Sequence, residues 1–339
     1  MAADGPERCA GLQPDPGALA DAASHPLVAV LLVGTVLAPV AAYLAWTLAL
    51  RERFAGVMAR LVDTLRSYED LLPWMLRLSL GIALAAAGTV GYLFTPLLGE
   101  EYYGGPAPFH FALFLLGFLY LLGLLVRLAA LATVALFLYA LGTSHFVLGA
   151  TEILGAALAL LVLGGGRPGI DHLAQNTLDP RGRFGALLAY RPGLLGRLAP
   201  ATPLVLRVAF AVTLGYGALV EKLLNPALAA DVADQHGLAA LAPWPVGGWP
   251  VLVGTAELLL ALLFLVGFLT RAASVATFIV LTATLFYFGE SLASHVTLFG
   301  VASWLFTTGA GPLSVDRRLH PERGRRESRL RDVRRPLAD

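Results

Sequence analysis

The sequence predicts an all-α integral membrane protein with nine transmembrane helices, one leading helix and then two four-helix bundles. Three observations predict this class. Hydrophobic residues make up 57% of the chain and charged residues only 14%, too little charge to cover the surface of a soluble domain of this size. Long apolar stretches recur along the chain, and its two halves resemble each other.

The leading helix is predicted at Leu27–Leu50, a stretch without any charge that ends at Arg51. At about 1.5 Å per residue, a helix of this length crosses a hydrocarbon core of about 30 Å. Residues 1–26 form a predicted outer tail, in which four acidic residues stand against Arg8 alone. Because a secretory signal peptide begins with net positive charge, this segment is interpreted as a retained span.

The two predicted bundles occupy residues 73–171 and 203–316. A polar linker, 172–202, separates them, and a basic tail, 317–339, follows the second. Their eight spans are expected at Leu78–Leu98, Phe109–Val126, Leu128–Leu141, Leu148–Leu163, Leu204–Leu223, Trp249–Leu269, Ala272–Phe288 and Val296–Thr308.

The distribution of arginines among the loops tests the predicted number of spans. With nine spans, alternate loops collect nearly all the arginines: the segment 51–77, Arg127, the linker, Arg271 and the tail. Positive loops face the cytoplasm, so we expect a multi-pass cell membrane protein with its N-terminus outside and its C-terminus in the cytoplasm. The expected partners are therefore membrane lipids rather than nucleic acid.

Three landmarks recur in the same order in both halves, and each module starts on the same side of the membrane. This parallel topology differs from the inverted repeats of many transporters. The matching pairs are Leu72–Arg77 with Thr202–Arg207, Gly123–Arg127 with Gly267–Arg271, and Gly164–Asp171 with Gly309–Asp316.

With these landmarks, the second module resembles the DoxX family of four-helix membrane proteins. The resemblance rests on Arg207, Gly215–Lys222, Asn225-Pro226, Glu257, Gly267, Thr270-Arg271 and the closing Gly309–Asp316. The first module is similar but degenerate, since it keeps Arg77, Gly123, Arg127 and Asp171 but has Gly91, Tyr92 and Leu113 at the positions of Glu221, Lys222 and Glu257.

This resemblance implies a function, because the family includes DoxD, known as a membrane subunit of thiosulfate:quinone oxidoreductase. It implies a subunit of a quinone-linked redox complex, with a quinone as the bound cofactor or substrate and a redox or envelope protein as partner. Whether the chain is itself catalytic stays open. Two alternatives stay open as well: a small-solute transporter, and a membrane scaffold or assembly factor without catalysis.

The candidate functional residues are Glu221, Lys222 and Glu257. Glu257 lies eight residues beyond Trp249, about 12 Å along a helix. A carboxylate at mid-membrane costs about 2.5–3.5 kcal/mol on insertion scales, so it is expected to be paired or functional. We hypothesise one buried polar cluster of these three side chains, as a ligand or proton site, or alternatively as an ion pair that fixes the register of two helices.

A second set of charged residues is interpreted as structural and lies at the predicted inner face: Arg77, Arg127, Asp171, Arg207, Arg271 and Asp316. Arg207 and Arg271, which recur as Arg77 and Arg127, are expected to extend to lipid head groups, and a link from Arg271 to Asp316 or from Arg127 to Asp171 would close each bundle.

No metal site is predicted. The pairs His145 with Glu152 and Glu290 with His295 are only weak candidates, because neither has the spacing of a known metal motif. The single cysteine, Cys9, excludes an intramolecular disulfide or a CxxC redox pair.

Overall fold

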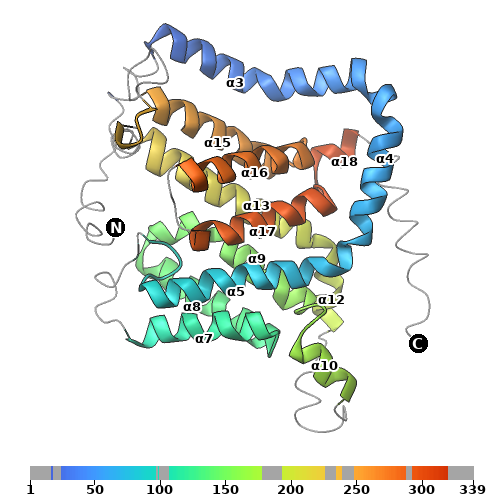
Figure 1. The fold of residues 1–339 in the computed structure, drawn as a ribbon, viewed down its shortest axis with the longest axis vertical. Coiled ribbons are helices and arrows are strands. Elements are labelled where there is room, and N and C mark those ends of the chain that lie inside the picture. The colour runs from blue at the N-terminus through green and yellow to red at the C-terminus, as the bar shows by residue number, and fades with distance from the viewer. Residues whose placement is uncertain are drawn as a thin grey trace.

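The computed structural model describes residues 17, 24–96, 98, 107–177, 193–225, 234–238, 248–287 and 292–319. Within these ranges the chain is built from helices and contains no β-strand. Most of the long helices run side by side along one common direction (Figure 1).

The helices of the first half are α3 (Pro26–Ala45), the π-helix η1 (Trp46–Leu50), α4 (Arg51–Ser67), η2 (Glu69–Leu71), α5 (Leu72–Val90), α7 (Ala107–Leu122), α8 (Val126–Thr143), η3 (His145–Ala150), α9 (Thr151–Leu163) and α10 (Ile170–Thr177). Those of the second half are α12 (Gly193–Leu198), η4 (Ala199–Ala201), α13 (Thr202–Tyr216), the π-helix η5 (Gly217–Leu223), α15 (Gly248–Val266), α16 (Thr270–Tyr287), α17 (Leu292–Thr308) and α18 (Val315–Leu319).

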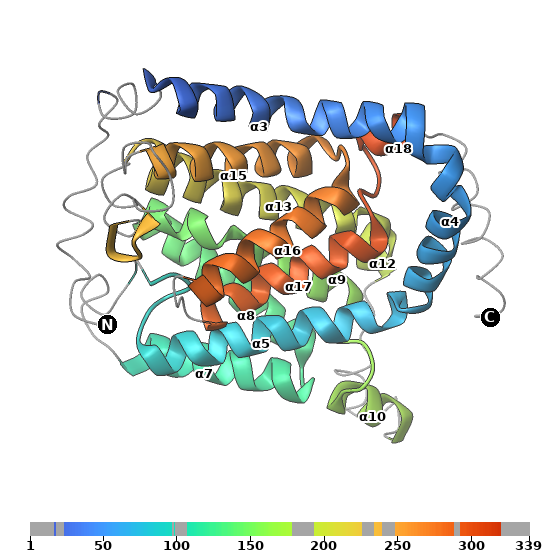
Figure 2. The same cartoon turned by 45° about the horizontal axis from the view of Figure 1, so that its top comes forward.

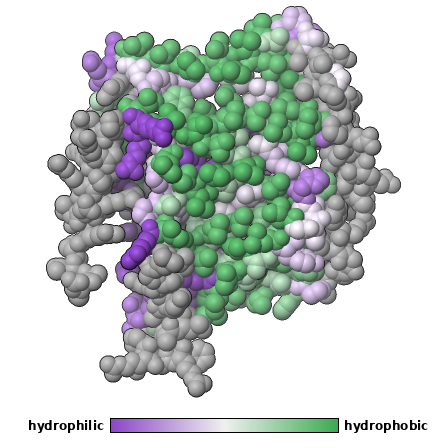
Figure 3. All heavy atoms as spheres, turned by 180° about the vertical axis from the view of Figure 1, so that it is seen from behind, coloured by the Kyte–Doolittle hydropathy of each residue, from purple (hydrophilic) through white to green (hydrophobic). Residues whose placement is uncertain are grey.

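Six helices in the described residues are long and apolar enough to cross a membrane, and three shorter apolar helices accompany them. This is the helix content of a multi-pass α-helical membrane protein. Figure 3 shows hydrophobic residues spread across the middle of one face, with hydrophilic residues gathered toward one edge.

The bounds of the helices differ from those of the predicted spans, and the difference is large at the second span. The stretch Leu78–Leu98 was expected to be helical, but α5 begins at Leu72 and ends at Val90. Gly91 ends the helix because it adopts a left-handed conformation, with φ of 94°, and its N–H donates to the carbonyl of Ala87. Hydropathy alone cannot locate such an end, since apolar residues continue beyond it.

The leading helix α3 lies on the outside of the bundle, alongside α15 (Figures 1 and 2). Val28 packs on Val251, and the rings of Tyr43 and Phe268 are 5.3 Å apart. Most other side chains of α3 are exposed and apolar. The helix therefore presents a surface suited to lipid.

Helix α4 runs across one end of the bundle, roughly perpendicular to the long helices (Figure 1). Met58, Val62 and Leu65 are half-buried on one side of it, whereas Arg53 and Arg60 are exposed on the other. This amphipathic pattern is typical of a helix that lies in the plane of a membrane interface. The end of the bundle that α4 crosses is called the arginine end below, because Arg77, Arg127, Arg207 and Arg271 lie there.

An aspartate closes the turn between two helices of each module at the arginine end. The carboxylate of Asp316 accepts hydrogen bonds from the backbone N–H groups of Leu269 (2.8 Å) and Thr270 (3.0 Å), which begin α16. Asp171 accepts in the same way from Leu125 (2.7 Å) and Val126 (2.9 Å), at the start of α8. Each carboxylate thus caps a helix N-terminus, where negative charge is favourable.

The expected pairs Arg127–Asp171 and Arg271–Asp316 are therefore wrong. Arg271 Nε donates instead to the carbonyl of Phe306 (3.0 Å), and Arg127 Nε donates to that of Leu161 (3.3 Å). These carbonyls lie in the last turn of α17 and α9, where helical carbonyls lack partners within the helix. The aspartates thus accept hydrogen bonds from backbone N–H groups at the start of one helix. The arginines donate to backbone carbonyls at the end of another.

Arg77 and Arg207 are buried and do not extend to head groups, which corrects the second expectation for this end. Arg207 donates to the carbonyls of Ala310 (2.8 Å) and Leu313 (3.1 Å), and Arg77 donates to that of Pro168 (2.7 Å). Each also interacts electrostatically with the aspartate of its own module. The two arginines hold the segment that closes each module against its first helix.

Replacing Asp316 with alanine is expected to lower the free energy of unfolding by about 1–2 kcal/mol, because α16 loses the cap on two backbone donors. The midpoint of denaturation of the detergent-purified protein measures this effect. Asp171→Ala should cost a similar amount, and Asp234→Ala, at an exposed position, should cost almost nothing. Equal losses in all three variants would contradict the capping role.

The modules meet through two close helix pairs, α9 with α13 and α5 with α17. At Gly155 a Cβ atom would collide with Ala209, and at Gly300 one would collide with Ser79. Small residues thus let these helices approach closely, as is common in membranes.

Candidate functional site

The first helix of the second module continues further than the equivalent helix of the first module. The candidate site lies at this extension. Helix α5 stops before Gly91, but α13 runs on through Tyr216 into the π-helix Gly217–Leu223. Short π-helical segments within α-helices are frequent at functional sites, since the wider turn moves side chains out of the regular helical pattern. This π-helix carries both Glu221 and Lys222.

Lys222 and Glu257 form an ion pair, with 2.8 Å between Nζ and Oε2. Gly254, one turn before Glu257, allows the close approach, because a Cβ atom there would press on Lys222 and Leu223. The two side chains keep exposed fractions of 24% and 12%, so the pair is mostly covered and still reachable from one side.

Glu221 joins the same group of charges. A Cβ atom on Gly217 would lie 3.9 Å from Glu221 Oε2, 3.9 Å from Lys222 Nζ and 4.0 Å from Glu257 Oε2. The structure therefore brings together all three residues of the predicted cluster around one glycine. Asn225 lies just beyond the π-helix, and its Nδ2 donates a hydrogen bond to the carbonyl of Val220 within it (2.6 Å).

Glu152 is a buried carboxylate whose partner was missed from the sequence. It begins α9, and its side chain is 4% exposed. The hydroxyl of Thr213 donates to Glu152 Oε2 (2.7 Å) and accepts from the Glu152 backbone N–H (2.9 Å). His295, in α17, interacts electrostatically with this carboxylate. Glu152 stands out in an apolar stretch, but nothing in the sequence connects it with Thr213.

The weak metal candidates are not assembled in the described part of the chain. Glu152 binds Thr213, whereas His145 is exposed and its ring contacts Phe146. Glu290 lies outside the described residues. No group of three or more His, Cys, Asp or Glu side chains that could hold a metal ion occurs in the described ranges.

Glu257 lies at the middle of α15, whereas Lys222 lies near the end of η5 and Glu152 near the start of α9. Gly149 connects the cluster with Glu152, because a Cβ atom there would lie 3.7 Å from Glu221 Oε1 and 3.3 Å from the ring of Tyr216. Gly149 belongs to η3, which leads directly into α9 and Glu152. Ionisable side chains thus extend from a partly accessible ion pair in the second module to the buried junction between the modules.

Comparison of the chain with protein-family models, curated proteins and solved structures finds no match.

Proposed function

We propose that this chain is a DoxX-like membrane protein that binds a quinone for a redox partner. In this proposal the nine apolar helices all span the membrane, with the N-terminus outside and the arginine end in the cytoplasm. The observation that carries it is the Lys222–Glu257 ion pair, held within apolar helices of one module only. Charged side chains at such positions are costly and commonly serve a ligand or a proton path.

The residues present suit a quinone head group. Such a head group has carbonyl oxygens that accept hydrogen bonds, and Lys222 Nζ is a donor at the partly exposed side of the cluster. The carboxylates of Glu221 and Glu257 lie beside it and are proton acceptors. Apolar side chains exposed on the same helices, among them Leu219 and Leu262, provide a surface for an isoprenoid tail.

When bound, the quinone supplies the two-electron chemistry, since it takes up two electrons and two protons to become a quinol. The electrons come from the redox partner. Lys222 Nζ orients the head group by donating to a carbonyl oxygen. The ionised carboxylates of Glu257 and Glu221 would each take up a proton from water and pass it to the head group as it is reduced.

Purification from native membranes, with mass spectrometry of proteins and extracted lipids, tests this proposal. Wild type should retain about one quinone per chain, and Lys222→Met or Glu257→Gln should reduce the retained quinone at least about tenfold, a loss of about 1.4 kcal/mol in binding. Asp234→Asn is the matched control, because it removes an exposed charge outside the cluster.

Quinone missing from wild type, or retained equally by all variants, would overturn the proposal. Solute counterflow in vesicles that depends on Lys222 would then favour a transporter. A stable protein partner without quinone or transport would favour a scaffold.

A further inference from the structure

A second candidate binding site lies at the arginine end, far along the bundle from the charged cluster. It is a groove of about 570 Å³ between α4, α5, α16 and α17, so both modules contribute to it. Its walls are almost entirely apolar and include Leu65, Tyr68, Trp74, Phe278, Ile279 and Phe306. A groove of this character fits a hydrocarbon chain.

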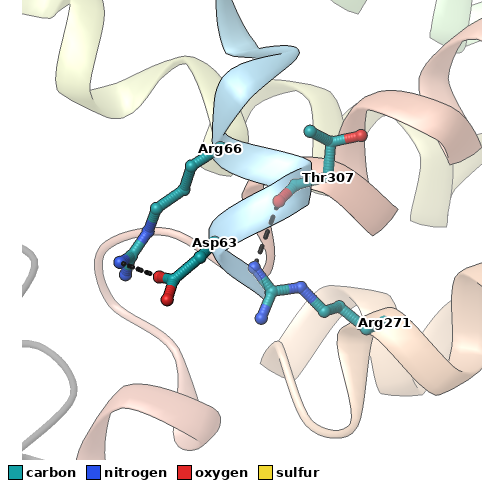
Figure 4. A network of polar contacts seen from close by, with 4 residues as sticks. All are labelled: Asp63, Arg66, Arg271 and Thr307. Atoms are coloured by element: carbon teal, nitrogen blue, oxygen red, sulfur yellow. Dashed lines mark hydrogen bonds and ion pairs between the residues drawn. The ribbon is translucent and has the colours of Figure 1, made fainter. Parts of the chain in front are cut away.

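Two arginines lie close to residues that line this groove. Arg66 follows the lining residue Leu65 on α4 and pairs with Asp63 (3.3 Å). Arg271 Nη2 donates to the carbonyl of Thr307 (3.1 Å), and Thr307 also lines the groove. Figure 4 shows these four residues where α4 passes the ends of α16 and α17. Asp63 is 72% exposed, so water screens much of its charge.

We propose that the groove binds an anionic phospholipid. One acyl chain lies among the apolar walls, and the phosphate lies at the guanidinium groups of Arg66 and Arg271. Guanidinium groups are well suited to phosphate because they present several donors in a planar fork. The position of α4 supports this orientation, since an amphipathic helix in the plane of an interface holds its arginines at head-group depth.

The equivalent position in the other half of the repeat differs from this groove. There the sequence has Leu204 in place of Trp74, and the preceding turn carries Arg197 but no tyrosine. The two aromatic residues thus occur on one side only. One lipid of this kind is therefore expected per chain.

Native mass spectrometry of the detergent-purified protein, titrated with phosphatidylglycerol or phosphatidylcholine, tests this proposal. Phosphatidylglycerol should bind at one site more tightly than phosphatidylcholine, and Arg66→Gln should weaken its binding about fivefold. Arg60→Gln is the matched control on the exposed side of the same helix and should leave this affinity unchanged. Ser303→Leu, which fills the groove from α17, should weaken binding of the lipid without changing any charge.

Equal affinity for the two lipids in wild type would overturn the proposal. Equal weakening by Arg66→Gln and Arg60→Gln would also overturn it, because the attraction would then be a general property of the basic surface. Unchanged binding in Ser303→Leu would show that the groove holds no acyl chain. None of these results depends on the quinone proposal, because the cluster residues stay intact in every variant.

Discussion

Replacing Lys222 with methionine is expected to destabilise the protein by about 2–4 kcal/mol. The substitution keeps the apolar length of the side chain but leaves Glu257 without the cation 2.8 Å away. Removing one member of a buried ion pair is costly because the remaining charge stays in a poorly solvated place. The residual exposure of both side chains keeps the loss below that of a fully buried pair.

A double-mutant cycle isolates the contribution of this pair. Adding Glu257→Leu to Lys222→Met should restore most of the lost stability, since leucine is the residue that the first module has at this position, as Leu113. The midpoint of denaturation in detergent compares wild type, both single variants and the double variant. A loss in the double variant equal to the sum of the two single losses would mean that the charges contribute independently.

Replacing Gly267 with alanine is expected to cost about 3–5 kcal/mol. Gly267 has φ of 67°, a left-handed conformation that is unfavourable for residues with a Cβ atom. The added Cβ would also collide with the guanidinium group of Arg207, which holds the carbonyls of Ala310 and Leu313. Displacing that buried guanidinium group breaks hydrogen bonds to a charged donor.

Gly237 provides a matched control for this prediction. Its φ is 66°, nearly that of Gly267, but no atom lies within 4 Å of a Cβ built on it. Gly237→Ala should therefore cost only the backbone term, about 1–2 kcal/mol. Denaturation of the two variants side by side gives the difference. If Gly267→Ala lost no more stability than Gly237→Ala, the packing against Arg207 would contribute nothing.

The helices were predictable because lipid imposes a simple requirement on sequence. Each apolar stretch expected to span the membrane overlaps an apolar helix in the described residues, since an apolar segment in lipid satisfies its backbone as a helix. The positions of the helix ends were less predictable. The end of α5 depends on the conformation of Gly91 and not on hydropathy.

The pairing of charges at the arginine end was not predictable from residue types. Opposite charges suggested that Arg271 and Asp316 would pair, but helix ends offer competing partners. The carboxylate meets two free backbone donors at the start of α16, and the guanidinium group meets carbonyls at the end of α17. Such backbone partners become visible only when the helix ends have been placed in space.

The charged cluster was partly predictable, and the junction between the modules was not. Glu257 and Lys222 could be matched because Glu257 is the one charge in its span and Lys222, with a long side chain, ends the preceding span. Glu152 and Thr213 lie in different modules, 61 residues apart, and threonine is common in apolar helices. Their contact depends on how α9 packs against α13, which a single sequence does not encode in any local pattern.

The unequal halves have a consequence for assembly. Two identical four-helix subunits related by a two-fold axis would each carry any charged pair, and a dimer would offer two equivalent docking faces. In this chain Tyr92 and Leu113 occupy one half where Lys222 and Glu257 occupy the other. A partner that recognises the charged face should therefore bind in a single orientation and at a ratio of one to one.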